Sequence, residues 1–180
     1  MSTYPCHHAS TIEHERIVER IVEEFKPKLN VLKIDAHPCE LTYEDGDMNG
    51  SYKKHVAPLD PKVVFHIVKV LGTLPGIRRL ATLAHELGHY TSDCNGTRTA
   101  LYEEAINKPP MEQRTLDECR AILHEESLAW GYGLKIAPRH GLNDASEFRV
   151  IALEGLEAYR NRVALPAEEF DCVVAGWEQL

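Results

Sequence analysis

The chain has 180 residues, of which 43% are hydrophobic and 27% are charged, and this composition is typical of one globular domain with a buried core. The formal net charge is −8, and the longest basic runs are the pairs Lys53-Lys54 and Arg78-Arg79. Sequence-independent binding to the phosphate backbone of nucleic acid needs clustered Lys and Arg. The negative charge therefore argues against nucleic acid as a direct ligand and favours protein partners.

The first half of the chain predicts one helix and then short strands. We expect residues 1–11 to form a flexible tail. From Ile12 to Phe25, apolar residues recur every three to four positions and acidic residues fill the other face, which indicates an amphipathic helix that Pro27 ends. A run of β-branched residues at 63–71 favours a strand over the helix that Asp60-Pro61 could begin. Strands are expected at 31–34, 51–56 and 63–71, with a turn at 44–50 before the second of them.

The second half of the chain is mostly helical by pattern. Residues 78–90 place Leu80, Leu83, Ala84 and Leu87 on one face of a helix. A helix, a few strands and then further helices predict an α+β fold, with residues 12–180 forming a single domain. The later helices are expected at 116–136, 146–163 and 167–180.

The cysteines and the hydropathy pattern indicate the cellular compartment in which the protein is expected. The five cysteines are odd in number and widely spaced, and they form no CxxC pair, so reduced and buried thiols are expected rather than a disulfide framework. The N-terminal 25 residues contain no apolar signal region, and no stretch approaches the ~18 apolar residues of a membrane span. We therefore expect a cytoplasmic protein without membrane contact. The cysteines are Cys6, Cys39, Cys94, Cys119 and Cys172.

The segment His85-Glu86-Leu87-Gly88-His89 carries the strongest chemical signal in the chain. Residues four apart on a helix share a face, so two imidazoles at this spacing can bind one zinc ion. Zinc lowers the pKa of bound water toward 7, and a glutamate directly after the first histidine can take the proton. The simpler alternative is a surface helix with two solvated histidines.

Gly88 favours the functional interpretation of this helix. Glycine inside a helix costs about 1 kcal/mol relative to alanine, so its presence suggests that another element approaches closely there. The metzincin class of zinc sites would need Gly at position 92 and His at position 95, but the chain has Ser92 and Asn95. The third zinc ligand must therefore come from elsewhere, and the helix expected at 116–136 is the best source.

Glu126 is the third ligand that the helical pattern favours. It lies in the apolar stripe of its helix, where an unpaired carboxylate is costly unless it binds a metal ion. Small residues at 129 and 133 would let this helix pack closely against Gly88. Glu125, nearer the edge of the stripe, and His124, in a more solvated position, remain alternatives. An inward glutamate could also pair with Arg78 or Arg79, and Glu103-Glu104 is another source of a carboxylate.

These residues resemble a known family. LAHELGHY, followed by Glu126-Ser127-Leu128-Ala129, resembles the HExxH…ExxA pattern of gluzincins, and within them the ImmA/IrrE-like group of small cytosolic metallopeptidases. The resemblance covers roughly residues 12–137 and is most specific at LAHELGH. It implies a zincin-like fold, in which a small mixed sheet packs on the active-site helix and the ligand helix, with additional C-terminal helices.

The resemblance also implies a function. His85, His89 and Glu126 would bind Zn²⁺, and Glu86 would be the general base in the hydrolysis of a protein or peptide substrate, by family likeness a regulator. The reaction also needs a group that stabilises the oxyanion, for which Tyr132, Tyr90, His124 and His140 are candidates.

Two other classes of protein fit the same residues. In the first, a non-catalytic zincin-like domain, zinc would hold two helices together and the domain would bind a partner protein. In the second, a metal-free helical adaptor, the motif would have arisen by chance. A Glu86→Gln variant would lose the function of an enzyme but keep the function of a non-catalytic zincin-like domain. Zinc in the purified protein would distinguish both of these from the metal-free adaptor.

Overall fold

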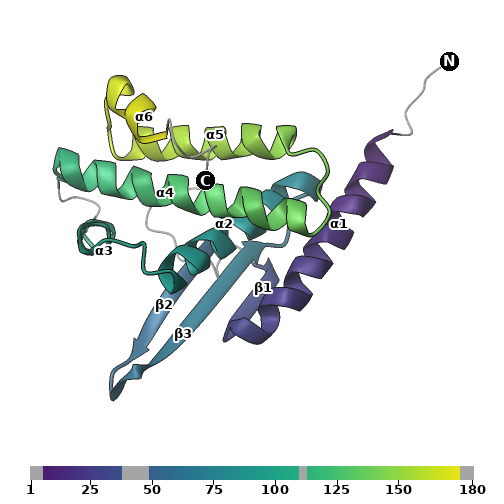
Figure 1. Ribbon diagram of the computed structural model, residues 1–180, viewed down its shortest axis with the longest axis horizontal. Helices are drawn as coiled ribbons and strands as arrows, with labels where there is room; N and C mark the ends of the chain where they lie inside the picture. The colour runs from purple at the N-terminus through teal and green to yellow at the C-terminus, as the bar shows by residue number, and fades with distance from the viewer. Residues whose placement is uncertain (1–5, 38–48, 110–112, 175–180) are drawn as a thin grey trace.

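The computed structural model describes residues 6–37, 49–109 and 113–174, and these form an α+β arrangement of a small mixed sheet and helices (Figure 1). Six α-helices, one 3-10 turn and three strands occur in these ranges. The expected α+β class is therefore correct. No helix within these ranges is long and apolar enough to cross a membrane.

The sheet has the strand order β1-β3-β2. Its strands are β1 (Val31–Ala36), β2 (Gly50–Ala57) and β3 (Asp60–Leu71), so all three expected strands are present and each is longer than expected. β1 is parallel to β3, and β2 is antiparallel to β3. Residues 44–48 of the expected turn lie outside the described residues. The turn that joins β2 to β3 was not expected from the sequence; it holds Pro58 and Leu59.

Helix α1 (Cys6–Phe25) precedes a 3-10 turn (Lys26–Lys28). The helix begins six residues before the expected start at Ile12, so the predicted tail over residues 1–11 is wrong for residues 6–11. Those six residues contain neither proline nor glycine, so nothing in them stops the helix from extending toward the N-terminus. The expected apolar face is correct, since Ile17 and Ile21 are fully buried.

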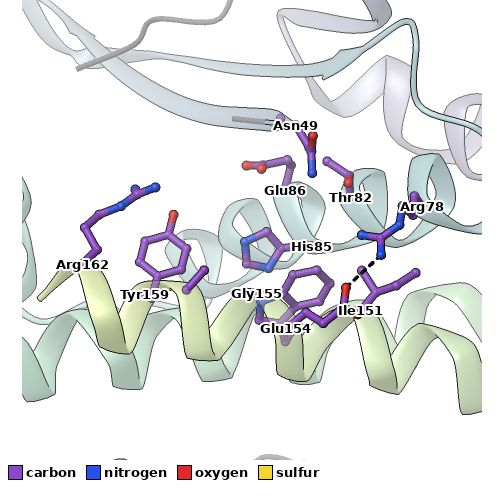
Figure 2. A pocket seen from close by; sticks show the side chains of 13 residues that line it. Asn49, Arg78, Thr82, His85, Glu86, Ile151, Glu154, Gly155, Tyr159 and Arg162 are labelled. Atoms are coloured by element: carbon purple, nitrogen blue, oxygen red, sulfur yellow. Dashed lines mark hydrogen bonds and ion pairs between the residues drawn. The ribbon is translucent and has the colours of Figure 1, made fainter. Parts of the chain in front are cut away.

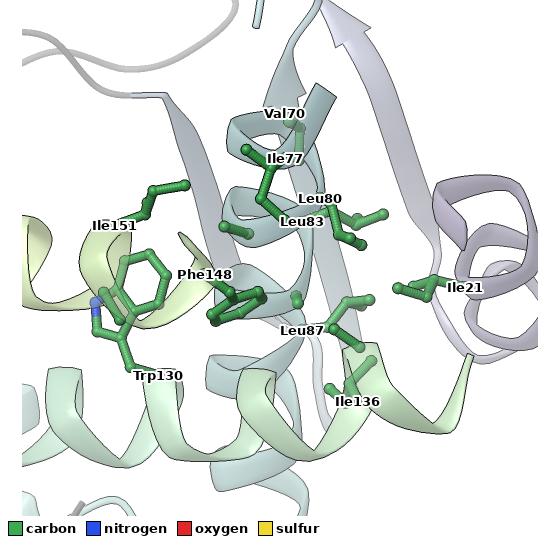
Figure 3. Close-up of a cluster of buried hydrophobic side chains, with 14 of the residues drawn as sticks. Ile21, Val70, Ile77, Leu80, Leu83, Leu87, Trp130, Ile136, Phe148 and Ile151 are labelled. Carbon is green, nitrogen blue, oxygen red and sulfur yellow. The ribbon is translucent and has the colours of Figure 1, made fainter. Parts of the chain in front are cut away.

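Helix α2 (Gly76–Cys94) carries the HExxH motif through the centre of the molecule. It packs against β2 and β3, and also against α1, α4 and α5, so nearly all of its faces are covered. Leu80, Leu83 and Leu87 are fully buried in the main apolar core, as their spacing predicted (Figure 3). Each fully buried leucine contributes about 1.5–3 kcal/mol relative to an exposed one, so this core fixes the position of α2.

Helices α3 (Ala100–Ile106) and α4 (Leu116–Arg139) follow. The sequence pattern did not reveal α3. Helix α4 begins where expected because Thr115 and Glu118 form a reciprocal capping box that satisfies free backbone N–H groups. It continues three residues beyond the expected end at Ile136, with Pro138 inside its last turn.

Helices α5 (Ser146–Arg162) and α6 (Ala167–Val174) complete the described chain. Both were expected, although the last six residues of the helix predicted at 167–180 lie outside the described residues. α5 packs along α4 and also contacts α2, as Figure 1 shows for α4 and α5. The C-terminal helices therefore belong to the body that holds the HExxH helix.

Two glycines bring α2 and α4 into close contact. A Cβ atom on Gly88 would overlap the backbone carbonyl of Ala129, and one on Gly133 would lie 3.1 Å from the backbone of Ala84. The expectation that Gly88 marks a close approach is therefore confirmed, together with the expected role of small residues at 129 and 133. This contact places the motif beside the middle of α4.

Among the three cysteines whose burial the structure describes, the expectation of a buried thiol is correct for Cys119 alone. Cys94 and Cys172 are free but exposed, because Cys94 is the last residue of α2 and Cys172 lies on the outer side of α6. Cys39 lies outside the described residues, and the burial of the Cys6 side chain is not described.

Candidate metal centre

Three buried side chains from α2 and α4 converge on one point. His85 and His89 come from one face of α2, and Glu126 comes from the facing side of α4. One ligand atom from each residue lies within 4.8 Å of the other two. Glu126 Oε2 is 3.3 Å from His85 Nε2 and 3.4 Å from His89 Nε2. The structure thus brings together the three residues that the sequence analysis selected as ligands.

Glu125 lies behind this cluster rather than in it. Its Oε1 is 3.3 Å from His89 Nδ1, so it contacts the far side of that imidazole. Ser92 Oγ donates to its other oxygen at 2.9 Å, and Arg98 Nε donates to Oε1 at 3.1 Å. A carboxylate in this position fixes the orientation and tautomer of a ligating histidine.

The donor set suits a metal ion. A carboxylate oxygen can only accept a hydrogen bond, so His89 Nδ1 carries a proton toward Glu125. In the neutral imidazole, Nε2 then directs a lone pair toward the ionised Glu126. Within the described residues, Glu126 Oε2 is buried without a hydrogen-bond partner. Two electron-rich atoms at this distance repel each other unless a cation lies between them, and the cation is either a proton or a metal ion.

The pKa values of the metal-free cluster follow from this arrangement. Burial by itself would lower the pKa of His89, but the charge of Glu126, the hydrogen bond to Glu125 and the short contact with Glu126 raise it to about 10. Burial would raise the pKa of Glu126, but His89 and His85 hold it well below its usual range. Burial lowers the pKa of His85, which Glu126 only partly opposes. A proton on His89 therefore takes the place of a metal ion at neutral pH.

The Glu86 carboxylate lies next to Gly50 of β2, within reach of the charges of His89 and Glu126. Burial raises its pKa to about 7, opposed by the charge of His89 and by a hydrogen bond from the Tyr52 backbone. A Cβ atom on Gly50 would lie only 2.8 Å from Glu86 Oε1, so the glycine leaves room for this carboxylate. Glu86 is thus a buried carboxylate whose pKa suits proton transfer near neutral pH.

A cavity of about 260 Å³ opens beside His85 and Glu86 (Figure 2). α2 forms one wall and α5 forms the facing wall, and an ion pair of 2.9 Å between Arg78 and Glu154 joins the two. Trp130 of α4 stacks on the His85 ring with centroids 4.1 Å apart, which fixes the imidazole plane. The lining residues are Asn49, Gly50, Arg78, Thr82, His85, Glu86, Trp130, Ile151, Glu154, Gly155, Ala158, Tyr159 and Arg162.

The alternative ligands lie elsewhere. His124 is exposed on α4, as its solvated neighbourhood predicted. The two arginines that could have neutralised Glu126 are engaged with other residues, because Arg78 pairs with Glu154 and Arg79 pairs with Glu15. Glu103 lies on α3, where it pairs with Arg98.

None of the four residues considered for oxyanion stabilisation lines the cavity. Tyr132 accepts a hydrogen bond from Asn95, His140 contacts Glu24 of α1, and Tyr90 packs on His66. Two of the polar residues that line the cavity from α5, Tyr159 and Arg162, were missed. No motif in the sequence marks them, and only the packing of α5 against α2 brings them near Glu86.

Comparisons with known proteins identify no relative, since no family model, no curated protein and no solved structure matches the chain.

Proposed function

We propose that this protein is a zinc-dependent metallopeptidase with a zincin-like fold, in which His85, His89 and Glu126 bind zinc and Glu86 is the general base. The likeness of its motifs to the ImmA/IrrE-like group is part of this proposal. By that likeness, the substrate is a cytosolic regulatory protein.

One observation carries the proposal: three buried ligands converge within 4.8 Å beside a buried carboxylate that faces a cavity. A catalytic zinc site needs three protein ligands and an open fourth position. Two histidines and one glutamate meet the first requirement, and the cavity next to His85 gives access for the second. Zinc bound there would polarise a carbonyl group and lower the pKa of water toward 7.

Glu86 supplies the proton transfers of the reaction. Its carboxylate accepts a proton from the attacking water and then gives it to the leaving amine. With a pKa raised to about 7 by burial, the group exchanges a proton readily at neutral pH. The hydrogen bond from the Tyr52 backbone holds the carboxylate at the rim of the cavity.

The position of β2 supports a peptide as substrate. β2 is one of the two edge strands of the sheet, and its first residue, Gly50, lies beside Glu86. An extended peptide can add to such an edge through backbone hydrogen bonds. A peptide bound in this way would pass close to the general base.

The first test measures zinc and activity in the same preparations. Wild-type protein should contain about one zinc per chain by elemental analysis, and His89→Ala should contain almost none. Wild-type protein should cleave a mixture of unfolded casein peptides, detected as new amino termini by mass spectrometry. Glu86→Gln should keep its zinc but lose activity by at least about 100-fold, because the proton acceptor is gone.

Other results of these zinc and activity measurements would contradict part or all of the proposal. Zinc in the wild type with full activity in Glu86→Gln removes the general-base role. Zinc without cleavage by the wild type favours the non-catalytic zincin-like domain, in which the metal joins α2 to α4. Absence of zinc from both proteins, after metal is supplied, rules out the metallopeptidase.

A further inference from the structure

Helix α5 presents two adjacent rows of side chains to the cavity. Ile151, Gly155 and Tyr159 form one row at a spacing of four residues, and Glu154, Ala158 and Arg162 form the other. Figure 2 shows Ile151, Gly155 and Tyr159 on α5, across the cavity from His85 and Glu86. α5 therefore forms a wall of the proposed active site, although its sequence carries no motif of such a site.

We propose that Tyr159 is a further catalytic residue, whose phenolic O–H donates a hydrogen bond to the carbonyl oxygen of the scissile peptide as negative charge develops on it. The inference rests on the proposed function. Tyr159 keeps its proton throughout, and the proton transfers remain with Glu86.

The hydroxyl group of Tyr159 is free to act as a donor. It makes no hydrogen bond to any residue that the structure describes, although the side chain is partly buried. Its oxygen points toward the α2 side of the cavity in Figure 2. The charge of Glu126, then burial and the charge of Glu86, raise the pKa of Tyr159 well above its usual value. The ordinary pKa of a phenol, about 10, already keeps the group protonated at neutral pH.

Three other donors that line the cavity are less suitable. The guanidinium group of Arg78 is paired with Glu154 at 2.9 Å. The indole nitrogen of Trp130 is covered, since a Cβ atom on Gly155 would lie 3.2 Å from it. Thr82 lies one turn before Glu86, on the side of the general base.

The packing of α5 holds Tyr159 in place. Gly155, one turn earlier on the same row, lets α5 approach within contact of Trp130, since a Cβ atom there would lie 2.8 Å from the indole ring. Arg162 stacks over the Tyr159 ring with its guanidinium carbon 5.0 Å from the centroid. A donor fixed before the reaction stabilises the oxyanion without reorganisation, which is the condition for a large effect on rate.

The test compares Tyr159→Phe with Tyr132→Phe in the zinc-loaded protein. Both variants remove one hydroxyl, but Tyr132 lies outside the cavity. For the best-cleaved casein peptide, Tyr159→Phe should lower kcat by about 100-fold or more and leave KM within threefold, since the lost bond forms mainly in the transition state. Tyr132→Phe should match the wild type. Elemental analysis should find the same zinc content in all three proteins.

A second readout does not depend on turnover. Phosphoryl-Leu-Trp carries a tetrahedral phosphorus whose oxygen stands in for the oxyanion. By calorimetry, Tyr159→Phe should bind it at least tenfold more weakly than the wild type, and Tyr132→Phe should bind it equally.

The outcomes separate this inference from the proposed function. If Glu86→Gln is inactive while Tyr159→Phe keeps wild-type kcat and affinity for the analogue, Tyr159 has no catalytic role and the metallopeptidase stands. Loss of zinc from Tyr159→Phe would also overturn the catalytic role. If the wild type neither cleaves peptides nor binds the analogue, both conclusions fall together.

Discussion

Glu125 and Glu126 are adjacent in the sequence but contact the motif in different ways. Glu126 faces the Nε2 atoms of His85 and His89, whereas Glu125 contacts Nδ1 of His89. Ser92 and Arg98 hold Glu125, so its charge is neutralised within the protein. Glu126 has no such partner among the described side chains apart from the two histidines. We therefore assign Glu126 to the proposed zinc ion and Glu125 to the orientation of His89.

This assignment predicts different losses of zinc affinity from the same chemical change. Glu125→Gln should weaken zinc binding about 10–100-fold, as is typical when a carboxylate behind a ligating histidine is changed. Glu126→Gln should weaken binding by more than this range, because a ligand is lost. Competition with a chromophoric chelator measures both constants. The reverse order would move the third ligand to Glu125.

At the scale of elements, the proposed site depends on how closely α2 and α4 approach. Gly88 and Gly133 lie on the two sides of the contact, and each faces the backbone of the other helix. A protein interior is packed too densely to absorb an added methyl group at such a point without movement of the backbone. Separation of the helices would move Glu126 away from His85 and His89.

The contact predicts graded effects for two alanine substitutions. Gly88→Ala should destabilise the fold by about 3 kcal/mol or more, because its methyl group would overlap the Ala129 carbonyl. Gly133→Ala should cost about 1 kcal/mol, since its nearest contact of 3.1 Å needs only a small shift. Urea unfolding measures both losses.

His124→Ala, on the exposed face of α4, is the matched control and should change stability by less than about 0.5 kcal/mol. Equal losses in the two glycine variants would show that the close approach at Gly88 is not the limiting contact.

At the scale of the whole molecule, zinc would connect the central helix to α4 and so stabilise the fold. A ligand that binds only the folded state adds about 4 kcal/mol when its free concentration is 1,000 times its Kd. In the metal-free protein, a proton on His89 provides part of this stability. Because its pKa is raised from 6.5 to about 10, that contribution is complete below pH 6.5 and is lost as the pH rises toward 10.

The stabilisation by zinc should therefore increase with pH. The difference in Tm between zinc-loaded and chelator-treated protein should be larger at pH 8.5 than at pH 6.5, because the proton on His89 competes with zinc less well at higher pH. Differential scanning calorimetry at the two pH values measures it.

His89→Ala serves as the control, and its Tm should not respond to zinc at either pH. A difference in Tm that is the same at both pH values would contradict proton competition at His89.

The sequence by itself determined the features that depend on spacing within one element. The helical period places His85 and His89 on one face, and it assigns Ile17, Ile21, Leu80 and Leu83 to the core. It also placed Glu126 in the apolar stripe of α4. The period is a local property of the backbone, so the residues alone reveal it.

Only the tertiary structure decided how separate elements meet. It brings Glu126 to the two histidines, places Glu125 behind His89, and makes α5, with Tyr159, the wall of the cavity. These contacts join residues 36–74 positions apart, and they depend on the side-chain packing that sets where each helix lies. No spacing along the chain encodes that packing. For this reason the sequence could not exclude Tyr132 as the oxyanion donor, and only the packed helices show that it lies outside the cavity.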